Sequence, residues 1–279
     1  MSKWLSIFLD GENLEEKCSL LFEFGVAGST LCSDGSANCF YKSEDGSINQ
    51  QLTSEIQNLE LIVIKIEDVE EKNWTHTCDA LFEPVQVGSL KILPLKSSDE
   101  SKGLDFNPQS DILIIPGTGF GTGHHATTFN LLKLLQHPEL KSSTPRTILD
   151  AGTGSGILAI GACRLFDCKI DAYEVDALAV ENAQENVALN KFEDRIALFC
   201  ESVHRCEQSY DLVIANLYAE LLEMLCSHLV ARGNEHAYFL LSGIRADLVA
   251  GVIKKYEDHG LTCIEKVLSD GWAALMLKR

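Results

Sequence analysis

The residues best suited to chemistry lie in a glycine-rich segment, where residues 150–156 read DAGTGSG. An apolar run ends at Asp150, and a longer apolar stretch with helical character follows the segment. Glycines at a turn from a strand to a helix let the backbone approach a ligand more closely than side chains would allow. We therefore expect Gly152, Gly154 and Gly156 to contact a bound cofactor.

The spacing of these glycines separates two classes of cofactor. A dinucleotide fingerprint is G-x-G-x-x-G/A, whereas here the third small position is Ile157 and the extra glycine comes one residue early. Asp150 also favours a methionine-type ligand over a pyrophosphate, because its carboxylate can orient the loop and attract an ammonium group but repels phosphates. A nicotinamide oxidoreductase is therefore the disfavoured alternative. Residues 148–159 resemble motif I of the class I methyltransferases.

A second carboxylate stands where a ribose contact is expected. Glu174 ends the next apolar run, and a carboxylate about 20 residues beyond a glycine-rich turn is placed to bind both ribose hydroxyls. Asp176 follows two residues later and is expected to cap the following helix. The alternative for Glu174 is an exposed strand end without a ligand.

Asn216 follows another apolar run, Leu212–Ala215. Because the carboxyl ends of parallel strands face the ligand crevice, a polar side chain here is either a helix cap or part of the transfer site. Residues 216–219 read NLYA, a looser version of the Asn/Asp-Pro-Pro-Tyr sequence of amine methyltransferases. The amide oxygen can accept a hydrogen bond from an amine and direct its lone pair towards a methyl carbon. Asparagine is not a base, so the amine must arrive neutral or lose its proton to water.

Residues 116–128 read PGTGFGTGHHATT, which is similar to the P-G-x-x-F-G-T-G-T-H-P-T-T segment of the PrmA family of ribosomal protein methyltransferases. The similarity continues in DAGTGSGILAI, NLYA and LSGI, which are residues 150–160, 216–219 and 241–244. Upstream, residues 73–74, 82–84 and 92–94 resemble the connector of that family. The resemblance covers about residues 70–279, whereas the first 70 residues match only in size and in strand–helix order.

This resemblance implies an S-adenosylmethionine-dependent methyltransferase that modifies the N-terminal amine and lysine amino groups of a ribosomal protein. It also implies that a small N-terminal domain holds the substrate. By the same resemblance, Thr128, Gly152, Glu174 and Asn216 would contact the cofactor, and Asn216 would be the catalytic residue. Without the resemblance, Thr127 and Thr128 would be expected to cap a helix.

Three positions depart from the family pattern: Ile115 replaces an acidic residue, His124 a threonine and Ala126 a proline. They lie beside the expected cofactor and substrate channel, so they bear on the identity of the substrate. The alternatives are a methyltransferase for a different protein or a small molecule, and a cofactor-binding scaffold without activity. The intact set of cofactor residues argues against the scaffold.

The apolar pattern divides the chain into residues 1–70, a connector over 71–110, and residues 111–279. The first part predicts a small α+β domain, with strands at 4–9 and 59–66, a helix at 12–24, and loops or a hairpin over 33–51. The connector contains Pro84, Pro94 and Pro108 and a polar stretch at 97–103.

The last part alternates strands and helices, which predicts a parallel sheet covered by helices on both faces. The predicted strands are 147–150, 169–175, 195–200, 210–217, 236–242, 261–268 and 272–277, and the predicted helices are 156–166, 177–190, 219–230 and 245–256. The last two strands must pair antiparallel, because residues 269–271 are too few for a crossover. The expected fold is the seven-stranded, mostly parallel Rossmann-like methyltransferase sheet with an antiparallel last strand.

The composition of the chain limits its expected location and the kinds of partner that it can bind. Residues 1–10 make a poor signal peptide, so the chain is expected in the cytoplasm. The net charge of −18 argues against direct nucleic-acid binding and is expected to attract a basic protein substrate; the alternative is that it serves only solubility. No run reaches the length of about 20 apolar residues that crosses a membrane. The ten cysteines contain no C-x-x-C pair, which favours reduced thiols. His124 and His125 lack a third ligand at suitable spacing, so no metal is expected.

Overall fold

Buried side chains form separate clusters in the two units of the chain, residues 1–80 and 81–279. The computed structural model describes residues 3–31, 36–43, 47–69, 83–117 and 123–279. Each unit has its own sheets and its own core, and each is described by itself below.

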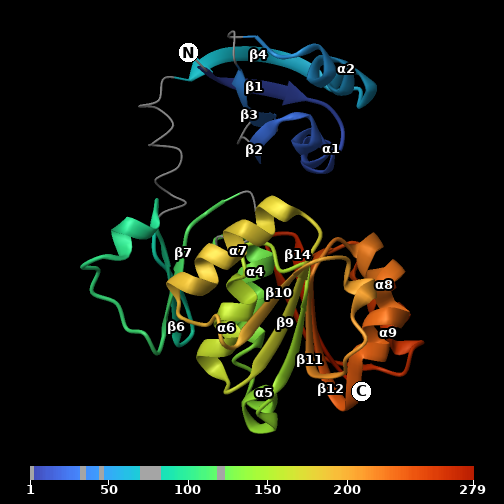
Figure 1. Ribbon diagram of the computed structural model, residues 1–279. Helices are drawn as coiled ribbons and strands as arrows, with labels where there is room; N and C mark the ends of the chain where they lie inside the picture. Colours follow the sequence, from blue (N-terminus) through green and yellow to red (C-terminus); the bar gives the residue numbers. More distant parts are fainter. Residues whose placement is uncertain (1–2, 32–35, 44–46, 70–82, 118–122) are drawn as a thin grey trace. The chain divides into compact units, whose positions relative to one another are not determined.

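The first unit contains a four-stranded antiparallel sheet in the order β2-β3-β1-β4 (Figure 1). Its elements are β1 (Lys3–Asp10), α1 (Leu14–Leu20), the 3-10 helix η1 (Leu21–Phe24), β2 (Val26–Leu31), β3 (Ala37–Ser43), α2 (Gln50–Asn58) and β4 (Ile62–Val69). Alternate residues of β1 (Leu5, Ile7 and Leu9) are buried with Leu52 and Ile56 of α2. The strand order interleaves two strand–helix–strand units, so this part is α+β, as expected.

Helix α2 is absent from the sequence-based prediction, which ended the loop region at residue 51. Only Leu52 and Ile56 of α2 are buried, and this single apolar pair on a polar helix is a weak periodic signal. The start of α2 is fixed by Asn49, whose side chain accepts a hydrogen bond from the Leu52 backbone N–H at 2.7 Å. The hairpin of β2 and β3 begins at Val26, seven residues before the predicted range.

The second unit is built on a seven-stranded sheet in the order β10-β9-β8-β11-β12-β14-β13 (Figure 1). Its strands are β8 (Thr147–Ala151), β9 (Lys169–Glu174), β10 (Ile196–Cys200), β11 (Tyr210–Asn216), β12 (Gly233–Arg245), β13 (Thr262–Ser269) and β14 (Trp272–Lys278). Neighbouring strands from β10 to β12 pair parallel, whereas β14 pairs antiparallel with both β12 and β13. The predicted mixed sheet and its antiparallel hairpin are therefore confirmed.

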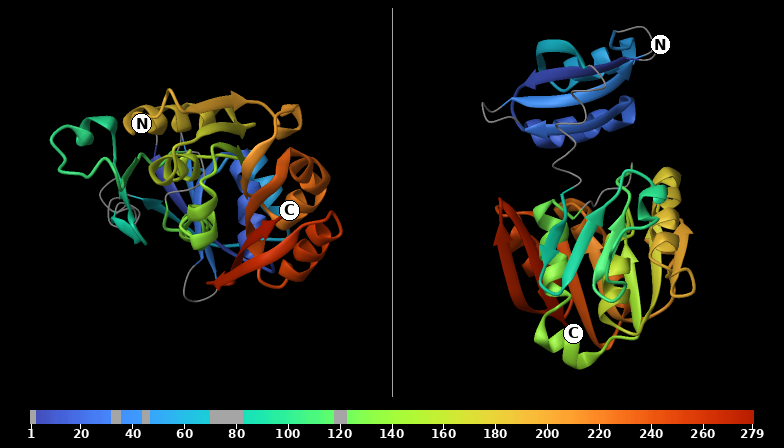
Figure 2. Two further views of the ribbon diagram at one scale, coloured as in Figure 1. Left: turned by 90° about the horizontal axis from the view of Figure 1, so that it is seen from below. Right: turned by 90° about the vertical axis from the view of Figure 1, so that its left-hand side faces the viewer.

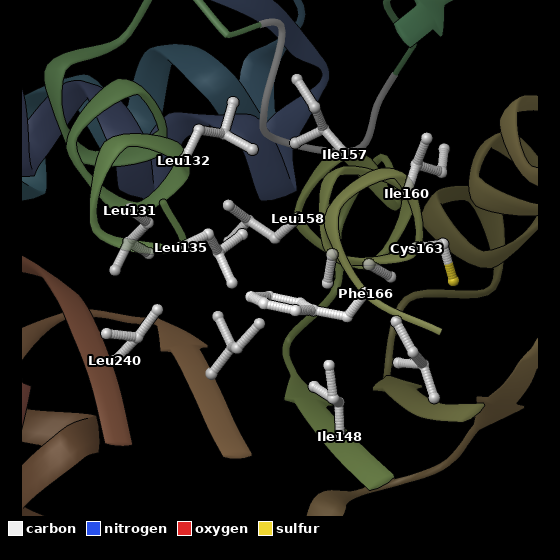
Figure 3. Packing of buried hydrophobic residues seen from close by; sticks show 14 of the residues in the cluster. Leu131, Leu132, Leu135, Ile148, Ile157, Leu158, Ile160, Cys163, Phe166 and Leu240 are labelled. Atoms are coloured by element: carbon white, nitrogen blue, oxygen red, sulfur yellow. The ribbon is translucent and has the colours of Figure 1, made fainter. Parts of the chain in front are cut away.

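Helices cover both faces of this sheet because the strands are apolar on both sides. The helices are α4 (Ala126–Leu134), α5 (Pro138–Ser143), α6 (Ile157–Leu165), α7 (Ala177–Leu189), α8 (Ala219–Arg232) and α9 (Val249–Glu257). Ile148 of β8 belongs to the cluster under α4 and α6, and the next residue, Leu149, belongs to the cluster under α8 and α9. Figure 3 shows the first cluster, where Leu131 and Leu135 meet Leu158 and Phe166.

Residues 83–110 differ from the expected connector, because they form part of the second unit. They contain β5 (Val85–Val87), β6 (Leu90–Pro94) and the 3-10 helix η3 (Ser98–Ser101), and β7 (Asp111–Ile114) completes a three-stranded sheet. This sheet packs on α4, α6 and α7 (Figure 2). Residues 83–110 fold with the second unit because the side chains of Val87, Leu90 and Ile92 are buried in its core. Prolines 84 and 94 sit at strand ends, which sheets tolerate. The boundary between the units therefore falls at residues 80 and 81.

Candidate functional site

The glycine-rich turn leads from the end of β8 into α6, as the sequence predicts. Gly152, Gly154 and Gly156 have φ values of +76°, +55° and +80°, a left-handed conformation that other residues adopt only at a cost. A Cβ atom on Gly152 would lie 2.6 Å from a methyl group of Leu217, beside Asn216. The turn therefore requires glycine both for its backbone conformation and for its close approach to the end of β11.

Strand β9 holds this turn in place through backbone and side-chain acceptors. The Tyr173 carbonyl accepts hydrogen bonds from the N–H groups of Gly152 (2.9 Å) and Thr153 (3.0 Å). One carboxylate oxygen of Glu174, Oε2, accepts from the Gly154 N–H at 3.1 Å. Two of the expected cofactor residues, Gly154 and Glu174, are thus brought together by a direct contact.

Asp150 lies under the turn and is fully buried. Its Oδ2 accepts a hydrogen bond of 2.6 Å from the Thr153 hydroxyl, which fits the expected role in orienting the loop. Its Oδ1 has no partner among the described residues. Burial raises the pKa of the Asp150 carboxyl to about 6; the Thr153 hydrogen bond opposes this rise, and the charge of Glu174 adds to it. Thr153 was not singled out from the sequence, although a hydroxyl three residues after an acidic strand end is a usable signal.

Glu174 stands at the carboxyl end of β9 and is half-buried. Its second oxygen, Oε1, accepts from the backbone N–H groups of Val175 (2.8 Å) and Asp176 (3.2 Å). Asp176 caps α7, as predicted, because its side chain accepts from the Leu178 N–H at 2.9 Å. The Glu174 carboxylate is therefore held at the strand end.

Asn216 and Thr128 meet although 88 residues separate them. The amide nitrogen of Asn216, at the end of β11, donates to the hydroxyl of Thr128 in α4 at 3.3 Å. Because the amide group is planar, this contact turns the amide oxygen of Asn216 away from Thr128. Thr128 itself is fully buried, and its hydroxyl holds the amide group of Asn216.

The start of α4 differs from the prediction. His125, rather than Thr127 or Thr128, is the N-cap residue, and its ring nitrogen accepts from the Thr127 backbone N–H. Its ring also meets Trp272 edge to face, with centroids 5.2 Å apart. The neighbouring His124, which departs from the family pattern, forms a hydrogen bond of 3.0 Å with the Glu83 carbonyl. Residues 118–122 of the same motif lie outside the described residues.

Ser242 and Gly243 hold the backbone next to Asn216, and the sequence analysis did not single them out as site residues. The Leu217 N–H donates to the Ser242 carbonyl at 3.0 Å, which ties the end of β11 to β12. Gly243 has φ +82°, and a Cβ atom there would lie 2.4 Å from the Leu217 carbonyl oxygen. Both residues belong to the LSGI segment, which the family resemblance identified without giving a physical reason.

The donor set of this site fits S-adenosylmethionine better than a phosphate-rich ligand. Asp150 and Glu174 form no ion pair with a described lysine or arginine, so the local charge is negative. A carboxylate pair suits hydroxyl groups and a cationic ligand, and it repels phosphates. The Cβ positions of Gly152 and Gly156 are taken up by Leu217 (2.6 Å) and Ala183 (3.5 Å), so the turn packs closely against both neighbours.

The described residues contain neither a metal-binding cluster nor a membrane-spanning helix. No group of three or more histidine, cysteine, aspartate or glutamate side chains in the described ranges is arranged to hold a metal ion. None of the helices described is long and apolar enough to cross a membrane. In the same part of the chain, the cysteines are free thiols.

Comparison with known proteins gives concordant matches. A model of the family described as ribosomal protein L11 methyltransferase (PrmA) matches residues 6–279. The chain is 34% identical over 218 residues to a protein of that name from Carboxydothermus hydrogenoformans, covering 76% of this chain and 68% of the relative. It is 38% identical over 212 residues to one from Desulfitobacterium hafniense, covering 74% and 64%.

A solved structure is also similar. The crystal structure of ribosomal protein L11 methylase from Lactobacillus delbrueckii subsp. bulgaricus shares 30% sequence identity, with a TM-score of 0.62. The match covers 71% of this chain and 99% of the solved chain.

Proposed function

Because the chain belongs to the ribosomal protein L11 methyltransferase (PrmA) family, we propose that it methylates amino groups of a ribosomal protein, with S-adenosylmethionine as the methyl donor. The observation that carries this proposal is the position of Asn216. Its amide group stands at the end of β11, held by Thr128, and the next residue touches the glycine turn. This arrangement supports a role for Asn216 beside the cofactor, at the carboxyl edge of the sheet.

The proposed cofactor contacts follow from the geometry above. The turn at Gly152, Gly154 and Gly156 lets the ligand approach the backbone, Asp150 orients the turn through Thr153, and Glu174 accepts hydrogen bonds from ribose hydroxyls. When bound, the cofactor supplies an electrophilic methyl group on a positively charged sulfur. The negative charge of Asp150 and Glu174 favours binding of that cation.

Asn216 is the proposed catalytic residue. Its amide oxygen accepts a hydrogen bond from the substrate amine and so directs the nitrogen lone pair along the line of attack. The amide has no basic group, so the amine arrives neutral or gives its proton to water. Catalysis by this chain then rests mainly on positioning, for which well-oriented reactions gain on the order of 7–11 kcal/mol.

The proposed protein substrate is basic, and the small unit at the N-terminus is proposed to hold it. The net charge of −18 attracts such a partner over long range. Methyl transfer from labelled S-adenosylmethionine in lysate of the source cell, followed by mass spectrometry, tests the substrate. Label on amines of the ribosomal protein supports the proposal. Label on another protein or a metabolite keeps the enzyme class and replaces the substrate.

Asn216→Ala tests the catalytic role. We expect turnover to fall by a factor of about 10²–10³, the loss seen when a single oriented polar contact is removed. The melting temperature should stay near the wild-type value, because the side chain is only half-buried. Thr128→Ser is the matched control, since it keeps the hydroxyl that holds Asn216. Wild-type turnover in Asn216→Ala would exclude the assigned role.

A further inference from the structure

Three asparagines on α7 form a row along one face of the helix. Asn182, Asn186 and Asn190 are spaced by four residues, which places them one turn apart. We call these three residues the asparagine ladder. Asn186 and Asn190 are buried, and the ladder faces the strand β7 and the residues that follow it.

Two amides of the ladder bind the backbone as a neighbouring strand would. Asn190 accepts from the Leu113 N–H at 3.0 Å and donates to the Leu113 carbonyl at 2.7 Å. Asn186 does the same at Ile115, with distances of 2.8 and 3.3 Å. The registers match because four helical residues rise about 6 Å and two strand residues span about 6.6 Å.

Asn182 lies one turn nearer the start of α7 and also contacts the segment after β7. Its amide nitrogen donates to the Ile115 carbonyl at 3.0 Å, while its Oδ1 is buried without a partner among the described residues. A Cβ atom on Gly117 would lie 2.5 Å from the Asn182 amide carbon. Glycine at 117 therefore lets the chain pass close to the ladder just before residues 118–128 of the family motif.

Asn186 makes one contact that Asn190 does not make. Its amide nitrogen also donates to the Ser155 carbonyl at 3.0 Å, and Ser155 lies inside the glycine-rich turn. A single buried amide thus joins the turn after β8 to the segment after β7. The turn belongs to the proposed cofactor site, and the segment after β7 leads in sequence to the motif that contains Thr128.

We propose that Asn186 is a positioning residue for cofactor binding, because it fixes Ser155 and Ile115 relative to each other before the ligand arrives. This proposal rests on the proposed function, since it concerns the same cofactor site. Preorganisation of this kind increases affinity by reducing the ordering that must accompany binding. Asn190 has only a structural role, at the far end of the ladder.

Asn186→Ala and Asn190→Ala form a matched pair for testing this role. Each variant removes a buried amide that binds one backbone residue through two hydrogen bonds, Leu113 in β7 or Ile115 just after it, so both should lower the melting temperature. Only Asn186→Ala also removes the hydrogen bond to the Ser155 carbonyl in the glycine-rich turn. We expect its Kd for S-adenosylmethionine, measured by calorimetry, to rise about tenfold, equivalent to about 1.4 kcal/mol. The Kd of Asn190→Ala should stay within about twofold of the wild-type value.

The outcomes separate this proposal from the proposed function. A wild-type chain that does not bind the cofactor contradicts the proposed function itself. Wild-type binding with equal Kd changes in the two variants, or with none, overturns the positioning role. If Asn186→Ala does not fold, Asn186→Leu and Asn190→Leu replace the pair, because leucine keeps most of the side-chain volume and removes the amide.

Hydrogen exchange of the wild-type chain gives a second measurement that needs no variant. If Asn186 couples the two segments, added cofactor should slow exchange of the Ile115 amide more than exchange of the Leu113 amide. Equal protection of both amides contradicts the coupling, whatever the variants show.

Discussion

At the scale of single residues, the most unusual group of the site is the Asp150 carboxyl. It is fully buried and lies near a second carboxylate, Glu174, and its pKa is raised to about 6. A buried charge without a cationic partner lowers the stability of a fold. Two interactions offset this cost: Oδ2 accepts a hydrogen bond from the Thr153 hydroxyl, and the negative charge favours the proposed cationic ligand.

Asp150→Asn tests the stability cost of this carboxyl through its pH dependence. The folded pKa lies above the ordinary value of 3.8, so the folded state holds the proton more tightly than the unfolded state. The contribution of Asp150 to stability is therefore fully present below pH 3.8 and is lost as pH rises through about 6. Urea unfolding should show Asp150→Asn gaining up to about 3 kcal/mol relative to wild type between pH 4 and pH 7.

The neutral amide can still accept the Thr153 hydrogen bond, so the folded structure should be retained. A difference in free energy of unfolding that does not change with pH would show that Asp150 titrates normally. The cofactor Kd of Asp150→Asn should rise, since the variant loses a negative charge beside the site.

The residues of the site were predictable from the sequence where their signal is local. The glycine spacing, the carboxylate about 20 residues later and the polar end of an apolar run all lie within short segments. Contacts between distant segments were not predictable. The hydrogen bond between Asn216 and Thr128 depends on how α4 packs, and the ladder depends on the position of β7, where no strand was predicted.

At the scale of elements, strand β12 supports the end of β11. The pairing of β12 with β14 is irregular between Leu241 and Ile244, and Gly243 lies in this irregularity. Its positive φ lets the strand pass within contact of the Leu217 backbone. The position of Asn216 therefore depends on a glycine in the neighbouring strand.

Gly243→Ala tests this dependence. The added Cβ atom would meet backbone atoms of Leu217, which cannot move without displacing Asn216, so methyl transfer should fall at least about tenfold with a lower melting temperature. Gly271→Ala is the matched control, because Gly271 has φ +78° but nothing within 4 Å of its Cβ position. The control should lose only about 1–2 kcal/mol of stability and keep its activity. Equal activity losses in both variants would indicate general backbone strain.

Elements of the second unit were predicted to within a few residues where strand and helix patterns alternate strongly. Strands β5 and β6 were missed because both are short and are flanked by prolines: Pro84 precedes β5, and Pro94 ends β6. Their burial depends on α4, α6 and α7, which the local sequence does not show.

At the scale of the whole molecule, the two units have separate cores. The buried cluster of the first unit contains residues from 5 to 61, and the clusters of the second unit begin at Val87. Every proposed cofactor residue lies in the second unit. Cofactor binding and recognition of the protein substrate can therefore be separated by dividing the chain.

Residues 81–279 expressed alone test this separation. The fragment should unfold cooperatively and bind S-adenosylmethionine with a Kd within about twofold of the full chain, since its core is complete. Methylation of the ribosomal protein should fall by more than about tenfold, because the proposed substrate-holding unit is missing. A fragment that methylates the protein substrate as well as the full chain does would contradict the role proposed for the first unit.

The asparagine ladder also limits association between copies of this protein at high concentration. β7 is the outer strand of its three-stranded sheet, and an outer strand with free peptide groups is a template for aggregation. The peptide groups of Leu113 and Ile115 that point away from β6 are occupied by side-chain amides, so an approaching strand finds no free donor or acceptor there. The same three asparagines thus close a sheet edge to self-association.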